Sequence, residues 1–215
     1  MRERPMSAFV AQALRDAEHR RATAPAAPPH ALDGLTIDQL AQVASAGNVE
    51  AVGRLYDALV LPIYRYVAVR VHRPEDAEDL TQLVFERIVS SLPRYRSRGR
   101  PFEAWAFRIA RNAVIDHVRR DRAHEPLTDR HDAGHDETPD RLTVHGEEVR
   151  ELRSAIRLLT PDQQEALALR FAAGLSAEEA AQVMGKRAGT VRGLTFRAIA
   201  SLRRLLLPEE EQVVR

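Results

Sequence analysis

The chain has 215 residues, which is enough for one large domain or two small ones. Its 32 basic and 31 acidic residues give a formal net charge of +1, a balance that by itself argues against a nucleic-acid-binding protein. The absence of cysteine from the sequence excludes disulfides, thiol nucleophiles and cysteine-ligated zinc. No apolar run approaches the ~20 residues that span a bilayer, and the first residues make a poor signal peptide, so we expect a soluble, cytoplasmic protein without membrane insertion.

Every basic residue of the chain except Lys186 is an arginine. Arginine offers planar, forked donors that suit phosphates and base edges, which favours a nucleic-acid partner. The same bias, together with abundant alanine, is also what a GC-rich genome produces, and both explanations stay open at this stage.

The N-terminal half has apolar residues at helical spacing, except in its first 31 residues. Residues 1–31 end in a Pro- and Ala-rich stretch that buries too little apolar surface to fold alone, which indicates a disordered tail. Beyond it the spacing predicts four helices, of which the second bends at Pro62 and the third begins at Pro74 and is stopped by Pro93. Their expected ranges are about Ile37–Ala46, Val49–Val71, Pro74–Leu92 and Phe102–Arg120.

The C-terminal half follows a stretch, residues 121–146, in which Pro, Gly and scattered charges predict a linker. Helical signals resume near Glu147. Two segments beginning at Thr160 and Ser176 have the capping-box pattern, so helices are expected to begin there and to end at Gly174 and Gly185, with a last helix over about Gly189–Leu206. The sequence therefore predicts an all-α protein of two small helical domains joined by a flexible linker.

Residues 174–204 show the pattern of a helix-turn-helix: a short capped helix, a glycine turn and a longer basic helix. Between Lys186 and Arg204 there are six basic residues and no acidic one. An apolar stripe of Val191, Thr195, Ala198 and Leu202 would pack on the domain and leave the basic side chains for phosphates and guanine edges. The alternative is a helical hairpin whose basic face is merely solvated.

A second basic segment, residues 94–122, holds nine arginines against three acidic residues, a local net charge of +6. Tyr95, Phe102 and Trp105 are set among these arginines. Ring faces for unstacked bases and cations for the backbone are what single-stranded nucleic acid requires, so the segment favours that ligand. Two alternatives remain open: the aromatic rings can belong to the core, and the arginines can form a solvated face.

Residues 74–86 carry five acidic residues and no basic one, a pattern that complements the positive end of a helix dipole.

His131 and His135 have the spacing of a zinc pair, but Gly134 and Pro139 disfavour a helix there, and no third ligand is indicated. The sequence has no phosphate-cradling glycine loop and no catalytic constellation. We therefore expect no enzyme activity, no metal and no cofactor.

Three motifs resemble one family. The run Pro74–Gln82 followed by Val84-Phe85 resembles the core-polymerase-binding helix of bacterial sigma-70-family factors, above all those of the extracytoplasmic-function (ECF) group. The segments Phe102–Trp105, Arg108–Asn112 and Asp116–Arg120 are similar to that group's promoter-melting and −10-reading helix. Elements of its −35-reading domain are seen in Leu169-Arg170-Phe171, Gly174-Leu175-Ser176, Met184-Gly185 and Gly189-Thr190-Val191-Arg192.

The resemblance covers about residues 48–122 and 147–206, and it implies a division of the chain. Residues 32–122 would form a sigma-2-like domain for core binding, −10 recognition and melting. Residues 147–207 would form a sigma-4-like helix-turn-helix domain for −35 recognition. Residues 123–146 would be an acidic linker, with the tail at 1–31 and a C-terminal tail at 208–215 outside the domains.

The resemblance also implies partners and contact residues. The acidic helix would dock on the β′ subunit of core RNA polymerase, the helix at Thr160–Phe171 would meet the β subunit, and an anti-sigma factor would hold the protein inactive. Candidate polymerase contacts are Asp76, Asp79, Gln82 and Phe85. Candidate contacts to single-stranded −10 DNA are Arg98, Phe102, Trp105, Arg108, Arg111, Asn112, Arg119 and Arg120. Candidate contacts to double-stranded −35 DNA are Lys186, Arg187, Thr190, Arg192, Phe196 and Arg197.

This chain departs from the family's pattern at Gly193 and Leu194, where members often have polar or basic residues. We expect fewer donors to reach the groove there, with a different −35 sequence or readout of DNA shape. In the short helix, Ala180 replaces the usual isoleucine and trims one packing side chain. Two other hypotheses remain: a conventional DNA-binding regulator with an N-terminal sensor or dimerisation domain, and a helical interaction protein that keeps the surfaces without the activity.

Overall fold

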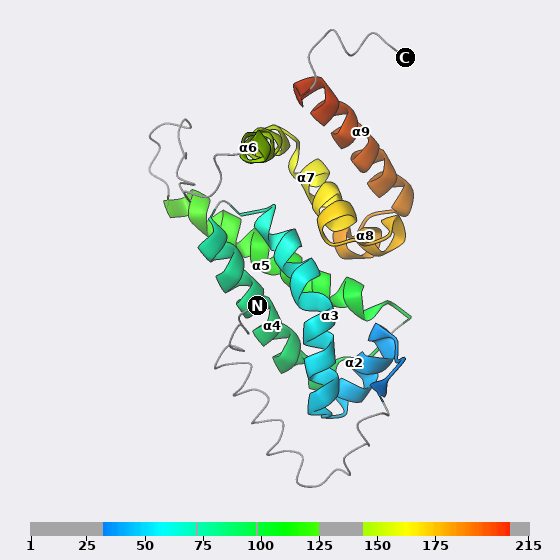
Figure 1. The fold of residues 1–215 in the computed structure, drawn as a ribbon. Coiled ribbons are helices and arrows are strands. Elements are labelled where there is room, and N and C mark those ends of the chain that lie inside the picture. Colours follow the sequence, from blue (N-terminus) through cyan, green and yellow to red (C-terminus); the bar gives the residue numbers. More distant parts are fainter. Residues whose placement is uncertain (1–31, 72, 98, 125–143, 207–215) are drawn as a thin grey trace.

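The computed structural model describes residues 32–71, 73–97, 99–124 and 144–206, and within these ranges it contains helices and no strand (Figure 1). The all-α class is therefore confirmed. The described segments include no helix with the length and apolarity needed to cross a membrane. The N-terminal half contains α2 (Ile37–Ser45), α3 (Val49–Ala68), α4 (Pro74–Ser91), the 3-10 turn η3 (Leu92–Arg94) and α5 (Phe102–His124). The C-terminal half contains α6 (Val144–Arg157), α7 (Pro161–Leu167), the π-helical turn η5 (Ala168–Ala172), α8 (Ala177–Met184) and α9 (Ala188–Leu206).

The helices of the N-terminal half begin where the sequence provides a cap. Thr36 forms a capping box with Gln39, and the side chain of Asn48 accepts a hydrogen bond from the N–H of Ala51 at the start of α3. Pro74 is the first residue of α4, where its missing N–H leaves no bond unmade. Two predicted ends were wrong: α3 ends at Ala68 rather than Val71, and α5 extends to His124, past Arg120.

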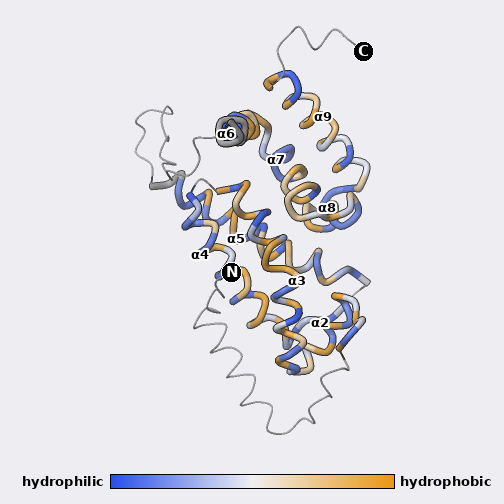
Figure 2. Tube along the Cα trace, in the orientation of Figure 1, coloured by the Kyte–Doolittle hydropathy of each residue, from blue (hydrophilic) through white to orange (hydrophobic). Residues whose placement is uncertain are grey.

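The core of this half lies between α3, α4 and α5, whose apolar faces turn inward (Figure 2). Tyr66 and Phe107 are both fully buried and meet edge to face, with ring centroids 5.8 Å apart. The predicted stripe of α4, including Leu80, Val84 and Ile88, is buried as expected. These contacts fix α5, the helix that carries most of the candidate −10 residues.

The helices of the C-terminal half follow the predicted caps closely. Thr160 and Ser176 each form a complete capping box, and Gly185 ends α8 in the left-handed conformation, with φ +66°. The helix predicted from Thr160 to about Ala173 is less regular than expected, because α7 gives way at Ala168 to the π-helical turn η5.

The two halves pack against each other. Helix α8 lies against α5, and η5 lies against α3, so that one continuous apolar cluster includes buried residues from both halves (Figures 1 and 2). A smaller cluster of Leu159, Leu167 and Ala198 joins α7 to α9 within the C-terminal half. The sequence predicted two domains on a linker but gave no sign of this contact. The predicted tails and residues 125–143 of the predicted linker, including His131 and His135, lie outside the described residues.

Candidate nucleic-acid and polymerase interface

Helices α8 and α9 form the predicted helix-turn-helix. Val191 and Ala198 are fully buried on the inner face of α9, and Thr195 is partly buried beside them. Leu194 is also buried, which corrects the interpretation of this position: it packs on the domain and is not a groove position that lost a donor. Leu205, at the far end of α9, is 47% exposed and does not belong to the packing stripe.

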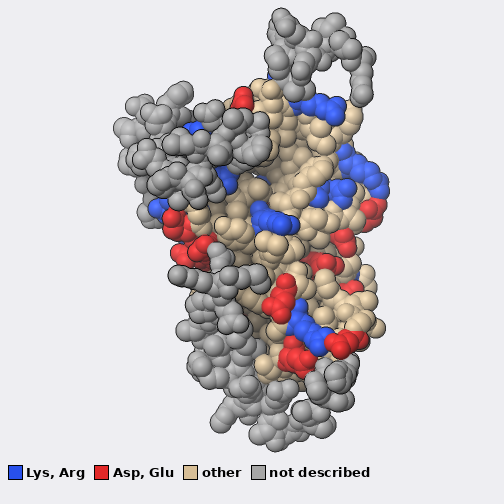
Figure 3. Space-filling model, in the orientation of Figure 1, with Lys and Arg blue, Asp and Glu red and all other residues tan. Residues whose placement is uncertain are grey.

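The outer face of α9 and the turn before it carry the candidate −35 residues. Arg187, Thr190, Arg192, Phe196 and Arg197 are all exposed, and the ring of Phe196 lies open to solvent. Such a face presents donors and one apolar ring at the surface, as a helix that enters the major groove requires. In the space-filling view, basic side chains are prominent over this half, while acidic ones gather over the other (Figure 3).

Two of these cations are already paired with carboxylates of the same half. Arg192 forms an ion pair with Glu178 of α8, and Lys186 Nζ lies 3.0 Å from Asp162 Oδ2 of α7. The Arg192–Glu178 pair is well exposed and the Lys186–Asp162 pair is partly exposed, so each contributes little to stability and can exchange for another anion. Over Gly193, the guanidinium of Arg197 folds back so closely that an added Cβ would lie 3.4 Å from Nη1.

The aromatic residues before and at the start of α5 form one cluster. The ring centroids of Tyr95, Phe102 and Trp105 lie 5.0 to 5.1 Å from one another. Phe102 is fully buried, and its backbone N–H donates to Asp38 Oδ1 at 2.6 Å, which anchors α5 on α2. In this structure the ring of Phe102 is part of the core, the alternative that the sequence left open, and its contact with a base stays a prediction. Trp105 is only partly buried.

Burial also raises the pKa of two groups, Tyr95 in this cluster and Glu103 beside it. The pKa of Tyr95 is raised, mainly because desolvation disfavours the phenolate. The pKa of the nearby Glu103 carboxyl is raised by desolvation first and then by the negative charges of Glu179 and Asp38. Because Glu179 belongs to α8, a like-charge repulsion acts between the two halves of the molecule.

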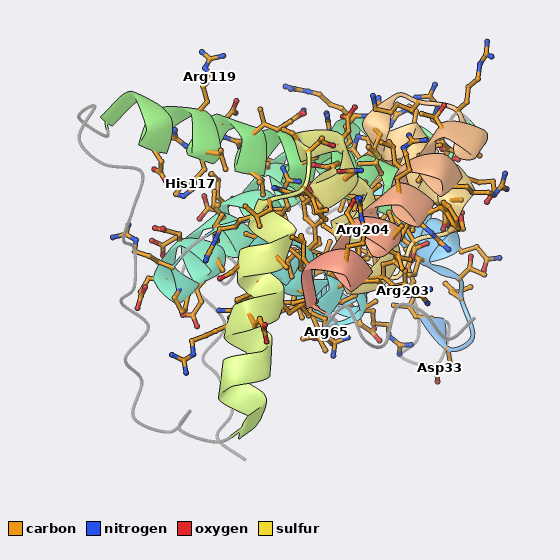
Figure 4. All side chains as sticks on the ribbon, turned by 90° about the horizontal axis from the view of Figure 1, so that it is seen from above. Asp33, Arg65, His117, Arg119, Arg203 and Arg204 are labelled. Atoms are coloured by element: carbon orange, nitrogen blue, oxygen red, sulfur yellow. The ribbon has the colours of Figure 1, made fainter. Side chains whose placement is uncertain are left out.

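The candidate −10 arginines of α5 differ in their surroundings. Arg119 is exposed and projects away from the helix on the side opposite to His117 (Figure 4). Arg120 and Asn112 are exposed as well. Arg108 is exposed but donates from Nη2 to the carbonyl oxygen of Gln182 in α8, at 3.0 Å. Arg98 lies outside the described residues.

Helix α4 presents the predicted acidic surface. Asp79 and Gln82 are exposed, and Asp76 accepts two hydrogen bonds of 2.9 Å from the guanidinium of Arg73. Phe85 is 3% exposed and its ring packs 4.7 Å from that of Tyr56, centroid to centroid. The ring of Phe85 is covered and supports the surface from beneath, and its contact with the polymerase stays a prediction.

One group with metal-ligand spacing occurs among the described residues. His117 Nε2 lies 3.0 Å from Asp121 Oδ2 and 3.7 Å from Asp76 Oδ2, so the three side chains join α5 to the start of α4. Asp76 is also held by Arg73 in a 2.9 Å ion pair.

The sequence analysis missed a buried polar cluster between the two halves, which we call the Glu165 cluster. Glu165 of α7 is 3% exposed. It accepts a 2.8 Å hydrogen bond at Oε1 from Tyr66 Oη, and its oxygens lie 3.3 Å from Arg70 Nη1 and 3.6 Å from Arg111 Nε. The pKa of Tyr66 is raised far above its usual range, first by desolvation and then by the charge of Glu165. Nothing in the sequence marks Glu165, because only the packing of the two halves buries it.

Comparison with known proteins identifies the family. The family model of sigma-70 region 2 matches residues 55–124, and that of sigma-70 region 4 matches residues 149–202. The chain therefore belongs to the sigma-70 family of RNA polymerase sigma factors, and to its ECF group. Region 2 is the −10 recognition domain of this family and region 4 is its −35 recognition domain.

Individual relatives agree with this assignment. The ECF RNA polymerase sigma factor BldN of Streptomyces coelicolor is 39% identical over 81% of this chain and 67% of its own length. The structure of CnrH in complex with the cytosolic domain of CnrY has a TM-score of 0.63 and 27% identity, covering 80% of this chain and 97% of that one. For the sigma factor RpoE in complex with the anti-sigma factor NepR from Bartonella quintana, the TM-score is 0.56 and the identity 26%, over 76% of this chain and 98% of that one. The predicted family and its function in promoter recognition are confirmed.

Proposed function

We propose that this sigma factor binds core RNA polymerase, directs it to promoters through −35 and −10 contacts, and opens the DNA with the residues assigned below. The observation that carries the proposal is the presence, in one chain and in the family's order, of a basic α5 in region 2 and an exposed basic face on α9 in region 4. A conventional regulator would not require both surfaces.

At the −35 element, we assign groove contacts to the outer face of α9. Arg192 and Arg197 are the candidates for guanine edges, because a guanidinium can donate two hydrogen bonds to one guanine. Lys186 and Arg187 in the turn are candidates for phosphates, which fix the position of the helix without reading sequence. Thr190 and Phe196 complete the face, the latter as an apolar contact for a thymine methyl group.

At the −10 element, we assign strand contacts to α5. Trp105 is the candidate for stacking on an unstacked base, since it is the most exposed of the three clustered rings. The backbone contacts are assigned to Arg108, Arg111, Asn112, Arg119 and Arg120. Binding to displaced bases lowers the free energy of the open state relative to the duplex, so opening requires no covalent step and no cofactor.

On core polymerase, we assign the contact to the exposed acidic side of α4. Asp79 and Gln82 lie at the surface, whereas Asp76 is held by Arg73 and must exchange that partner to bind. Because core polymerase and promoter DNA lie in the bacterial cytoplasm, we place the protein's action there. An anti-sigma factor is a further proposed partner, supported by the complex of the related sigma factor RpoE with NepR.

A run-off transcription assay with purified core polymerase tests the proposal. Transcripts from the protein's own upstream promoter should depend on this chain. Replacing Arg192 with alanine (Arg192→Ala) should lower them by about fivefold to a hundredfold, because a lost bidentate base contact is worth about 1–3 kcal/mol. Core binding, measured by fluorescence anisotropy, should stay unchanged.

The matched control is Arg157→Ala, which removes one exposed arginine from α6 outside the helix-turn-helix and should leave transcription unchanged. Equal loss of core binding and transcription in Arg192→Ala would contradict the assignment. Tight binding of the free protein to a duplex operator, without any effect on core polymerase, would support a conventional regulator instead.

A further inference from the structure

Helix α5 begins without a capping side chain of its own. Other described helices are capped by the side chain of the residue before them, namely Thr36, Asn48, Thr160 and Ser176. Before α5 stands Pro101, whose carbonyl oxygen accepts the first bond of the helix from the N–H of Trp105 but whose ring offers no acceptor. The N–H groups of the first turn therefore need an acceptor from elsewhere in the molecule.

Helix α2 supplies that acceptor through Asp38. Its Oδ1 accepts a hydrogen bond from the N–H of Phe102 at 2.6 Å, across 64 positions of the sequence. Asp38 lies in the first turn of α2, whose start is fixed by the capping box of Thr36 and Gln39. The carboxylate therefore lies at the positive ends of two helices at once, where a negative charge is favourable.

Helix α2 also holds the other end of the segment that leads into α5. It packs against η3 and against α5, and it lies beside the start of α5 (Figure 1). This segment is flanked by Tyr95 and Phe102, whose rings meet edge to face with centroids 5.0 Å apart. Desolvation is the first cause of the raised pKa values of Tyr95 and Glu103, and the charge of Asp38 adds to both. Asp38 thus lies close to both ends of the segment.

The position of Trp105 depends on this first turn of α5. Trp105 comes three residues after Phe102, on the same side of the helix, and the two ring centroids are 5.1 Å apart. Without Asp38 the N–H of Phe102 would lose its acceptor, and the first turn would fray as uncapped helix ends do. The indole ring would then have more than one orientation. A ring that stacks on a displaced base binds best when its orientation is already fixed.

From these contacts, and resting on the proposed function, we infer that Asp38 is a positioning residue for promoter opening, which holds the first turn of α5 so that Trp105 is preset to stack on a displaced −10 base. Asp38 contacts neither base nor phosphate, and it acts through Phe102 and Trp105. It lies before residues 55–124, the part of the chain that matches sigma-70 region 2. The inference therefore assigns a function in −10 recognition to α2, a helix outside that match.

The fluorescence of Trp105 tests this link in the free, full-length protein. Trp105 is the only tryptophan of the chain, so its emission reports on this site without a label. Asp38→Ala should shift the emission to longer wavelength and raise the acrylamide quenching constant at least twofold, because a frayed first turn exposes the indole to water. Emission and quenching equal to those of the unchanged chain would overturn the inference.

Promoter opening tests the consequence, with holoenzyme assembled from core polymerase and the promoter from the protein's own upstream region. Asp38→Ala should lower the equilibrium amount of open complex, measured by permanganate reactivity, about fivefold, which corresponds to the ~1 kcal/mol of a lost N-cap. Core binding and closed-complex formation, measured by fluorescence anisotropy, should stay within twofold. A general folding defect would lower all three quantities, and such a result would count against a positioning role.

Two further variants separate the hydrogen bond from the charge. Asp38→Asn removes the charge and keeps an oxygen that can accept from Phe102, so opening should stay within twofold of the unchanged chain. The matched control Asp57→Ala removes a carboxylate from an exposed position of α3 and should alter neither opening nor fluorescence. If Asp38→Asn opened DNA as poorly as Asp38→Ala, or if Asp38→Ala opened it better than the unchanged chain, Asp38 would act by its charge and the inference would be wrong.

A double-mutant cycle tests whether Asp38 acts through Trp105. In a chain that already carries Trp105→Ala, adding Asp38→Ala should change opening less than twofold, because the ring that Asp38 positions is gone. Circular dichroism and thermal melting check that the variants are folded, and Trp105→Leu, which keeps more of the packing, gives the same test if Trp105→Ala is not. A further fivefold loss in this background would show that Asp38 supports another part of α5, contrary to the inference.

Transcription separates this inference from the proposed function. Run-off transcription by the unchanged chain, together with undiminished opening by Asp38→Ala, would overturn the inference alone. Increased quenching of Trp105 in Asp38→Ala, with no transcript from the unchanged chain, would overturn the proposed function instead.

Discussion

The two proposed DNA-reading helices are in different situations within one structure. The outer face of α9 is exposed, and the paired cations Arg192 on that face and Lys186 in the turn before it are matched with carboxylates that are themselves exposed. On α5, Arg108 and Arg111 contact region 4, while Arg119 near the other end of the helix projects freely (Figure 4). The −35 helix is thus available in the free protein, whereas part of the −10 helix is covered.

The two helices therefore differ in how many contacts must be broken before their candidate residues can bind a new partner. Exposed ion pairs on α9 exchange for phosphates at little cost, so region 4 can bind without rearrangement. In region 2, Arg108 and Arg111 become free only when their contacts with region 4 are broken.

The first prediction compares one aromatic ring from each region. Phe102→Ala should lower the free energy of unfolding by about 3–5 kcal/mol, because a fully buried ring is removed from the aromatic cluster and leaves a cavity. Phe196→Ala, which removes a ring that is 75% exposed, should change stability by less than about 0.5 kcal/mol and still weaken −35 binding. Thermal or urea unfolding together with duplex binding separates the two outcomes. Equal destabilisation by both substitutions would mean that Phe196 is not a surface residue in solution.

The second prediction compares two arginines of α5. Arg111→Ala should lower open-complex formation about tenfold, since a charge-assisted contact of about 1.5 kcal/mol is lost, and should at the same time loosen the packed state by removing a partner of Glu165. Arg119→Ala should lower open-complex formation without any change in the distance between the two regions. Permanganate footprinting measures opening, and the distance between spin labels on α4 and α9 measures packing. If Arg119→Ala loosened the packing as much as Arg111→Ala, the cluster would not be the specific link.

The sequence predicted helix starts and turns better than helix ends. Local signals predicted the local structure well: Thr160, Ser176 and Gly185 each form the cap or turn that their chemistry favours. Helix ends without a strong stop signal were less well placed, as at Ala68 and His124, because tertiary packing rather than propensity decides where such helices end.

The candidate site was predicted less completely than the fold. An aromatic residue among arginines fits both a stacking surface and a core, and only burial showed that Phe102 and Phe85 belong to the core. Helical spacing alone did not place Leu194 on the packing side of α9. The Glu165 cluster could not be predicted at all, because it depends on how two separate domains dock, and a contact between residues 66 and 165 leaves no local pattern.

The third prediction concerns Glu103 of α5, whose pKa is raised first by burial and then by the negative charge of Glu179 of α8. The raised pKa of Glu103 means that the folded, packed protein favours the neutral carboxyl. This advantage is fully present below the carboxyl's ordinary pKa of about 4.5 and is lost as the pH rises through the raised pKa. Lowering the pH toward the raised pKa of Glu103 should therefore narrow the distribution of distances between spin labels on α4 and α9. The substitution Glu103→Gln should narrow the same distribution at neutral pH. It should also remove the contribution of Glu103 to the pH dependence. A broader distribution in Glu103→Gln would contradict the assignment of repulsion to this pair.

The last prediction concerns Gly193 on the exposed face of α9. Glycine inside a helix costs about 1 kcal/mol relative to alanine, so Gly193→Ala should raise the unfolding free energy of region 4 by up to that amount. The new Cβ meets only the end of the flexible Arg197 side chain, at 3.4 Å, and this guanidinium can move aside. The displaced guanidinium would then point further from the helix, so −35 affinity should change less than threefold while stability rises. A loss of stability would show that packing holds Arg197 in its position over Gly193. The outer face of α9 would then be less accessible than the exposure of its side chains indicates.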